Sequence, residues 1–452
     1  MKAPKKTNLI NLTSVQLIVL YYLGAAILST ILLSLPYTHK PGVEWTFIDA
    51  LFTAVSAISV TGLTVVSTAE TFSTFGVFVL AFILQFGGVG IMTLGTFIWL
   101  MLGRKIGLRE RQLIMTDQNR GTFSGLVHLM KQILSLILII EAIGAIILGT
   151  YFLRYFPSWQ EAFIQGFFAS VSATTNAGFD ITGESLIPFA HDYYVQTVNM
   201  VLLILGAIGF PVLIEVKESL QKRSKVHEPY KFSLFTKITT ITFFSLTVIG
   251  ALFIYLFERS HFFADTVWHE TLFYSIFQSI TTRNGGLATM DVSDFTVPTQ
   301  LLLSTLMFIG ASPSSVGGGI RTTTFAIVLL AIFSFARGRQ SVKVFHRELD
   351  PEDVLKSFVV ISVAVFITGS AVIALSIIEP FPLIAVIFEV CSAFGTTGLS
   401  MGITPDLSTP GKLIIIFLMF VGRIGVFSFL FIIRGKTTED LYHYPKERVI
   451  IG

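Results

Sequence analysis

Charged residues are scarce in this chain. Asp, Glu, Lys and Arg make up 13% of its 452 residues, whereas a soluble domain carries about 25%. Hydrophobic residues make up 53%, and the mean hydropathy is +0.76. Too little polar surface remains to cover a water-soluble globule of this size. The composition therefore predicts a protein that crosses the lipid bilayer several times.

Cysteine is almost absent as well, since Cys391 stands alone. One thiol excludes an internal disulfide framework and a metal site built from several cysteines. The motifs HExxH, GxxxxGK[ST] and GxSxG do not occur, and His269-Glu270 lacks the second histidine of a zinc helix. We therefore predict that the chain is not an enzyme and binds no cofactor. The formal net charge of +3 indicates no nucleic-acid partner.

A glycine-containing turn recurs about every 113 residues, so four units account for the whole length. Each unit has the same plan: a long apolar helix, a shorter amphiphilic segment, the turn, and a second apolar helix. The long helices are predicted at 12–36, 126–153, 232–258 and 354–379. The short segments are predicted at 44–57, 157–173, 266–280 and 380–394. The second helices are predicted at 73–102, 195–216, 299–335 and 411–434.

The basic residues indicate how the repeats cross the membrane. Most of the 31 Lys and Arg residues lie in segments 1–11, 103–125, 217–231, 336–353 and 434–452. The positive-inside rule places all of these segments in the cytoplasm. A short segment of about 14 residues reaches roughly 21 Å, less than the ~30 Å hydrocarbon core, so it enters the membrane and returns.

The predicted fold is therefore an all-α polytopic membrane protein. It has eight transmembrane helices and four re-entrant pore loops, arranged in pseudosymmetric helix–pore loop–helix repeats around one central pore. The repeats span 12–102, 126–216, 232–335 and 354–434. They are separated by cytoplasmic loops 103–125, 217–231 and 336–353, and flanked by a cytoplasmic N-terminus (1–11) and tail (435–452).

Four such loops around one axis suit a cation pathway. Each short helix points its partially negative C-terminal end at the turn, where carbonyl and threonine oxygens can bind a dehydrated monovalent cation. The alternative is that these glycines only cap helices. The outer stretches carry acidic residues, among them Glu70, Asp180, Asp291 and Asp406, and lack Lys and Arg. These carboxylates either steer cations or are ordinary solvated loop residues.

The four turns are Val60-Thr61-Gly62, Asn176-Ala177-Gly178, Asn284-Gly285-Gly286 and Thr396-Thr397-Gly398. They resemble those of the membrane subunit of bacterial Ktr potassium-uptake systems, in the Trk/Ktr/HKT superfamily of potassium transporters. The resemblance covers essentially the whole length. It implies that the turns form a potassium selectivity filter, with a potassium ion as the bound metal. The third turn, Asn284-Gly285-Gly286-Leu287, departs from the family's common Thr-Ala-Gly-Phe. The implied filter residues are Val60, Thr61, Gly62, Asn176, Ala177, Gly178, Asn284, Gly285, Gly286, Thr396, Thr397 and Gly398.

The second helix of repeat three contains a segment that cannot stay helical. As one continuous helix, 299–335 would be roughly 55 Å long, nearly twice the membrane thickness. Its middle is rich in Gly, Ser and Pro, which predicts either an intramembrane gate or a passive kink; the resemblance implies the gate. Arg321 either anchors this loop or extends towards the cytoplasm. The gate residues are Gly310, Ala311, Ser312, Pro313, Ser314, Ser315, Gly317, Gly318, Gly319 and Arg321.

Three further features lie inside apolar helices. Arg423 in the last helix resembles an arginine that the family carries below its filter. It either sets the electrostatic barrier to ions or pairs with a carboxylate such as Glu389. Glu141 and Lys131 are predicted to take part in interhelical pairing, with a role in the ion pathway as the alternative. The run 87–90, Gly-Gly-Val-Gly, is predicted to permit close helix packing rather than to bind a nucleotide.

The expected function is channel-like potassium uptake into a bacterial cell, driven by the membrane potential. A sodium- or proton-coupled symporter is the alternative, and an effect of sodium on uptake is left open. Potassium, with sodium as a second candidate, is the transported cargo. The resemblance further implies a homodimer in the cell membrane that docks on a cytosolic ring of nucleotide-binding regulator subunits. The basic loops and the tail would form the docking surface.

Overall fold

The computed structural model describes residues 13–90, 126–223 and 230–434, together with Pro445, Glu447 and Ile450. The predicted N-terminal segment 1–11, the loop 103–125 and most of the tail 435–452 lie outside the described residues. Within them the chain is helical apart from one short hairpin.

Four long apolar helices open the four repeats. They are α1 (Ser14–Leu33), α7 (Leu126–Phe152), α11 (Leu234–Glu258) and α15 (Pro351–Ile378). Each is long and apolar enough to cross a membrane. Their outward apolar side chains are exposed: Leu28, Ile146, Val248 and Phe366 are 57, 60, 66 and 75% accessible. A helix that buries one side and exposes Leu, Ile, Val and Phe on the other faces lipid rather than water.

A shorter helix follows in each repeat, and we call these four the pore helices. They are α2 (Phe47–Ser59), α8 (Trp159–Thr174), α12 (Trp268–Thr281) and α16 (Leu383–Gly395). At 13 to 16 residues they reach roughly 20–24 Å, too short to cross the hydrocarbon core. Hydroxyl side chains of Thr46 and Ser158 cap the first two, which fixes where those helices begin. Their C-terminal halves are buried at the centre of the molecule.

The second helices differ from the prediction. They are α4 (Thr74–Val89), α9 (Tyr193–Ala207), α13 (Val297–Phe308) and α17 (Thr409–Ile424). We predicted a break in repeat three alone, and this is wrong. Gly209, at φ +101°, separates α9 from α10 (Phe210–Arg223) by a bend of 103°. Gly425, at φ +89°, separates α17 from α18 (Val426–Arg434). A left-handed residue cannot continue a right-handed helix, so the chain turns at these glycines.

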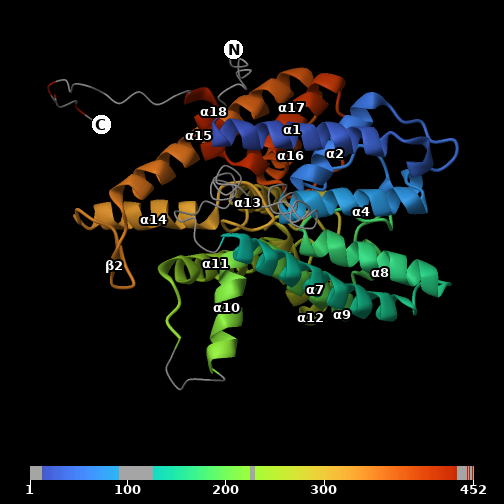
Figure 1. Ribbon diagram of the computed structural model, residues 1–452, viewed down its shortest axis with the longest axis horizontal. Helices are drawn as coiled ribbons and strands as arrows, with labels where there is room; N and C mark the ends of the chain where they lie inside the picture. The colour runs from blue at the N-terminus through green and yellow to red at the C-terminus, as the bar shows by residue number, and fades with distance from the viewer. Residues whose placement is uncertain are drawn as a thin grey trace, which may run out of the picture.

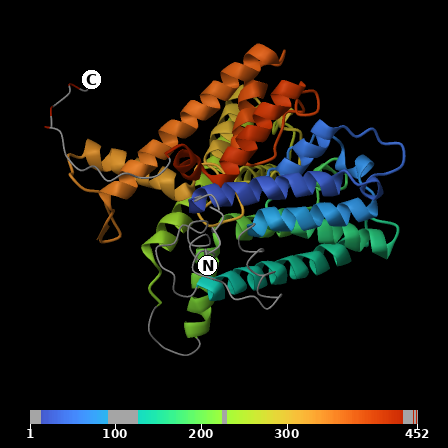
Figure 2. The same cartoon turned by 45° about the horizontal axis from the view of Figure 1, so that its top comes forward.

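The repeats close into a ring through one recurring contact. The second helix of each repeat packs on the pore helix of the next: α4 on α8, α9 on α12, α13 on α16, and α17 back on α2. Figures 1 and 2 both show the blue first repeat between the teal second repeat and the orange-to-red fourth repeat. The four pore helices therefore surround a common centre.

The remaining elements are short connections. On one side they include η1 (Pro36–Thr38), α3 (Thr68–Thr71), η2 (Ile187–Phe189) and η3 (Val292–Asp294). After α14 (Thr322–Ala336), strands β1 (Lys343–Val344) and β2 (Arg347–Glu348) form an antiparallel hairpin that projects from the helices (Figure 1). This hairpin lies in segment 336–353, which we predicted only as a cytoplasmic loop. Phe345 and His346, both at positive φ, form its two-residue turn.

Candidate functional site

The four turns adopt one backbone conformation. In each, a left-handed residue precedes the turn glycine by two positions, and the glycine itself has positive φ. The left-handed residues are Val60 (57°), Asn176 (53°), Asn284 (68°) and Thr396 (50°), and the glycines are Gly62 (92°), Gly178 (67°), Gly286 (67°) and Gly398 (95°). The repeat seen in the sequence is thus also a repeat in backbone dihedral angles.

Hydrogen bonds at the helix ends explain this conformation. In repeat one, Thr61 N donates to Ser56 O at 2.8 Å and Val60 N donates to Ala57 O at 3.1 Å. This pair of bonds is the Schellman motif, which places a left-handed residue just after a helix. The motif recurs in repeats two and four through Ala177 and Thr397.

The third turn follows a different pattern. Gly285 N donates to Thr281 O at 2.6 Å, and Arg283 N donates to Ile280 O at 2.9 Å. The departure noted in the sequence of this turn is therefore accompanied by a local difference in backbone bonding.

The turns touch one another in sequence order. A Cβ atom built on Gly62 would lie 2.5 Å from the carbonyl oxygen of Ala177 and 3.0 Å from the Cα of Gly178. A Cβ on Gly178 would lie 2.9 Å from the Cα of Gly286 and 3.3 Å from the carbonyl oxygen of Gly285. Only glycine fits these contacts, because real Cβ contacts are rarely closer than about 3.4 Å.

The same relation closes the ring. A Cβ on Gly286 would overlap the carbonyl oxygen of Thr397, and one on Gly398 would overlap that of Thr61 and lie 3.0 Å from the Cα of Gly62. Each turn glycine therefore faces the middle carbonyl of the next turn. The ring gathers four glycines and the carbonyls of Thr61, Ala177, Gly285 and Thr397.

The ring offers oxygen ligands without carboxylates. All twelve predicted filter residues are buried except Gly398, which is partly buried. Among the described residues no group of three or more His, Cys, Asp or Glu could hold a metal ion. Backbone carbonyls near the negative ends of four helices suit a monovalent cation better than a divalent one, which prefers carboxylates.

Two asparagines link neighbouring turns. Asn176 donates through Nδ2 to the carbonyl oxygen of Arg283 at 3.3 Å. Asn284 donates to the carbonyl and hydroxyl oxygens of Thr396 at 3.0 and 2.8 Å. Turns two, three and four are thus joined by side chains as well as by the packing of glycines.

The Gly-rich segment 310–320 lies against the inner side of these turns, and we call it the central loop. Its Gly318 N donates to Thr396 Oγ1 at 2.8 Å, and a Cβ on Gly317 would lie 2.7 Å from Asn284 Oδ1. Gly319 N donates to the carbonyl oxygen of Gly422 in α17 at 3.2 Å. The predicted gate residues are therefore adjacent to turns three and four.

The loop also contacts the break in repeat two. Ser312 N donates to Ala207 O at 3.1 Å, and Phe210 N donates to Ser314 O at 2.8 Å. Of the predicted gate residues before Arg321, only Pro313 and Ser314 are not fully buried. The broken helices of repeats two and three consequently satisfy one another's free backbone groups.

Both predicted arginines donate to carbonyls of this region. Arg321 Nη1 bonds Gly317 O, and Arg423 bonds Val316 O in the loop and Gly87 O in α4. Of the two alternatives given for Arg423, the ion pair with Glu389 is absent from the described residues, and the role in the electrostatic barrier stays a prediction.

The Glu389 carboxylate accepts instead from Ser400 Oγ at 2.8 Å and from the hydroxyl of Thr404. Two nearby hydroxyls on the loop after the fourth turn satisfy it, so it needs no arginine.

The structure also tests the predictions made for Glu141 and for the glycine run 87–90. Glu141 accepts from Gln85 Nε2 at 2.5 Å, which is an interhelical contact between α7 and α4, as predicted. Lys131 is exposed. A Cβ on Gly87 would lie 2.6 Å from the carbonyl oxygen of Ile58, so close packing is confirmed for this glycine.

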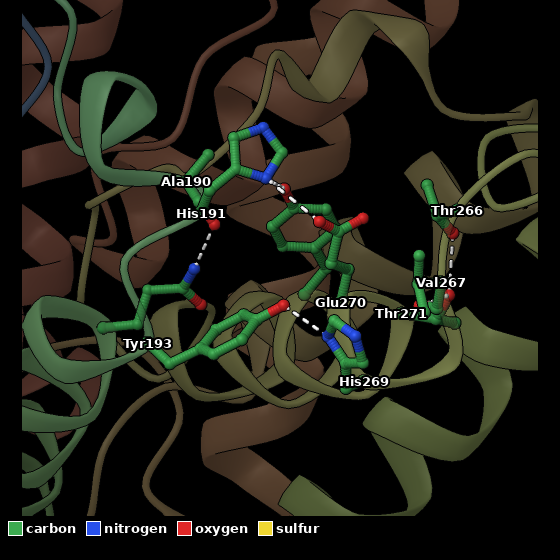
Figure 3. Close-up of polar contacts among 10 residues, drawn as sticks. Ala190, His191, Tyr193, Thr266, Val267, His269, Glu270 and Thr271 are labelled. Atoms are coloured by element: carbon green, nitrogen blue, oxygen red, sulfur yellow. Dashed lines mark hydrogen bonds and ion pairs between the residues drawn. The ribbon is translucent and has the colours of Figure 1, made fainter.

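Polar side chains connect the segment before α9 and the first residue of α9 in repeat two to the first turn of α12 in repeat three. Figure 3 shows His191 facing Glu270, with Nδ1 and Oε1 3.2 Å apart, and Tyr193 Oη 2.5 Å from His269 Nδ1. Nearby, Asp192 caps α9 and accepts from Tyr155 Oη at 2.5 Å. The carboxylate of Asp192 thus serves as a helix cap.

Arg283 is the residue that sequence reasoning missed. It stands inside the third turn motif, is 1% exposed, and donates to the carbonyl oxygen of Ile309. The signal was available, because a charged residue occupies a position where the other repeats have Ser59, Thr175 and Gly395.

Comparison with known proteins identifies the class. Residues 12–440 match the TrkH family model, described as cation transport protein. The chain belongs to this family, and is a membrane subunit of the Trk/Ktr superfamily. It is 63% identical to the Ktr system potassium uptake protein D of Bacillus subtilis, over 98% of both chains. It is 35% identical to the Ktr system potassium uptake protein B of the same organism, again over 98% of both.

A solved structure shares the fold. The potassium transporter TrkH from Vibrio parahaemolyticus superposes with a TM-score of 0.73 at 20% sequence identity, covering 95% of this chain and 86% of that one. The family and this likeness confirm a helical multi-pass membrane protein. These relatives are transporters, which confirms that the chain is not an enzyme.

Proposed function

We propose that the chain takes up potassium through a pore whose selectivity filter is the ring of four turns. The observation that carries this proposal is the cyclic contact of Gly62, Gly178, Gly286 and Gly398, each against the next turn's middle carbonyl. A ring of carbonyl oxygens replaces the water shell of an entering cation. Relatives described as potassium uptake proteins support potassium as the cargo.

The driving force is the membrane potential. The chain carries no nucleotide-binding motif, and each charge that crosses gains about 2.3 kcal/mol per 100 mV. The C-terminal ends of four pore helices supply the negative potential that offsets dehydration of the ion. Entry is from the outer face, because the basic residues mark the opposite side as cytoplasmic.

The central loop is proposed as the gate. Gly310–Gly319 combines four glycines with one proline, so the segment can change conformation without crossing large barriers. It is held by hydrogen bonds to turns and helices of repeats two and four. A buried segment directly beneath the filter blocks ion passage in one arrangement and permits it in another.

The finer topology belongs to the same proposal. The four first helices each cross the membrane once. The pore helices enter the membrane and return to the same side. The four second helices, each taken together with the segment after its break, also cross once, which gives eight crossings. Both termini lie in the cytoplasm. The chain is proposed to work as a homodimer in the bacterial cell membrane. A cytosolic ring of nucleotide-binding regulator subunits would dock on its basic inner face.

Uptake of ⁸⁶Rb⁺ tests the filter. Each of Gly62→Asp, Gly178→Asp and Gly286→Asp should reduce uptake in cells lacking other potassium transporters by at least tenfold, because a side chain enters the ring. Gly402→Asp is the matched control: Gly402 also has positive φ (83°), yet a Cβ there meets nothing within 4 Å. Normal uptake by all three filter variants would refute the proposal.

A further inference from the structure

Arg283 breaks the fourfold pattern at one defined position, three residues before the turn glycine. The equivalent residues bond their own pore helix or have no side chain: Ser59 Oγ donates to Val55 O at 2.6 Å, Thr175 Oγ1 donates to Val171 O at 2.7 Å, and Gly395 is a glycine. Arg283 alone extends away from its pore helix to another element.

The guanidinium of Arg283 has one partner among the described residues. Nη1 donates to the carbonyl oxygen of Ile309, while Nε and Nη2 have no hydrogen-bond partner there. An arginine stays charged inside proteins, so placing it 1% exposed is costly unless its position is required. It lies just beyond the C-terminal end of α12, which favours a cation.

The acceptor is a carbonyl that no helix can satisfy. Ile309 follows the last residue of α13 and precedes Gly310, the first residue of the central loop. In a continuous helix, Ile309 O would accept from the backbone N–H of residue 313. That residue is Pro313, which has none. The need for an outside donor therefore persists whether the loop is irregular or becomes helical.

We propose that Arg283 is a positioning residue that ties the upper end of the central loop to the third filter turn. The bond fixes Ile309 in place, so that the loop moves below this point while α13 and the filter do not. Because Asn176 holds the backbone of Arg283 and Asn284 holds turn four, the bond to Arg283 fixes the loop end relative to three turns. The role of the loop as a gate rests on the proposed function; the anchor does not.

Thiol labelling at the loop tests the anchor without relying on transport. Cys391 is the only cysteine, so Cys391→Ala gives a cysteine-free chain. In that background, Ser314→Cys places one thiol in the least buried part of the loop. The rate of its modification by a maleimide is measured on purified full-length protein in detergent, with and without Arg283→Met.

Loss of the anchor should raise the modification rate at least threefold, because the loop end is released. Arg283→Lys should restore the rate to within about twofold, since its ammonium can donate to the same carbonyl. Thr175→Ser is the matched control at the equivalent position of repeat two, and it should leave the rate unchanged because its hydroxyl bonds its own helix.

A monodisperse Arg283→Met protein that is labelled at the parental rate would overturn the proposal. If that variant does not fold, Arg283→Gln takes its place; its shorter neutral side chain does not reach Ile309 O, and an unchanged rate again overturns it. Labelling that rises while the Gly→Asp filter variants transport normally would support the anchor and refute the filter. Unchanged labelling, with transport abolished in the filter variants, would refute the anchor and support the filter.

Discussion

Substitution Gly87→Ala sets two physical effects against each other. Gly87 lies within α4 at ordinary helical dihedrals, so helix propensity alone predicts a gain of about 1 kcal/mol for alanine. Its added Cβ, however, would lie 2.6 Å from both Ile58 O and Val60 Cγ2, and 2.8 Å from Ala57 O. Ordinary contacts are about 3.5 Å or longer, so the first pore helix and turn must retreat by almost 1 Å.

Packing should outweigh propensity. Overfilling a close-packed site costs about 1–3 kcal/mol, and here two of the three neighbours are backbone carbonyls that cannot rotate away. We expect a net loss of stability of about 1–2 kcal/mol, with a lower thermal unfolding midpoint in detergent. Gly24→Ala is the matched control, because Gly24 lies in helix α1 and a Cβ there meets nothing within 4 Å.

The two alanine variants should therefore shift in opposite directions. Gly24→Ala should be neutral or slightly stabilising, while Gly87→Ala should unfold earlier and lose Rb⁺ selectivity because Val60 is displaced. A Gly87→Ala protein as stable as Gly24→Ala would refute the reasoning, and with it the close contact between α4 and the first turn.

Three further predictions concern other sites. Arg423→Gln should raise the rate of ion uptake several-fold, because Val316 O loses its charged donor and the loop is held less firmly; equal rates in proteoliposomes would argue against this. Burial is the largest effect on His39 and lowers its pKa, outweighing the hydrogen bond to the Leu33 backbone. Stability should be full above the ordinary value near 6.5 and fall with decreasing pH as the unfolded chain takes up the proton, a slope that His39→Gln should flatten. Glu379→Leu should lower the thermal midpoint, since it removes the acceptor of both the backbone N–H and the hydroxyl of Ser408; an unchanged midpoint would contradict that capping role.

The repeats and turns could be predicted because their signals are local. A pore helix of about 14 residues followed by Gly62 or its equivalents specifies a short helix and a sharp turn without reference to distant residues. The packing of Gly87 was predictable for the same reason. The additional breaks were not, because glycine is common inside transmembrane helices and nothing local in the sequence marks Gly209 and Gly425 as residues with positive φ.

Side-chain partners were harder to predict, because several groups that are distant in sequence can satisfy the same charged side chain. Glu389 was one candidate partner for Arg423, yet Ser400 and Thr404 are closer along the chain and satisfy the carboxylate of Glu389. Arg423 donates instead to the carbonyl oxygens of Val316 in the central loop and of Gly87 near the C-terminal end of α4. Arg283 was not singled out, because we compared the turn glycines of the four repeats and not the residues beside them.

The most direct test of the proposed four-turn filter is the ion selectivity of the purified chain. ⁸⁶Rb⁺ uptake into proteoliposomes would be measured under an imposed inside-negative potential, with potassium or sodium as competitor and no sodium gradient. If the ring of four turns selects potassium, uptake should be saturable and should increase with the potential. Added potassium should reduce it, whereas the same concentration of sodium should have little effect. Uptake that requires a sodium or proton gradient, or that sodium suppresses as well as potassium does, would contradict a potassium-selective ring of four turns.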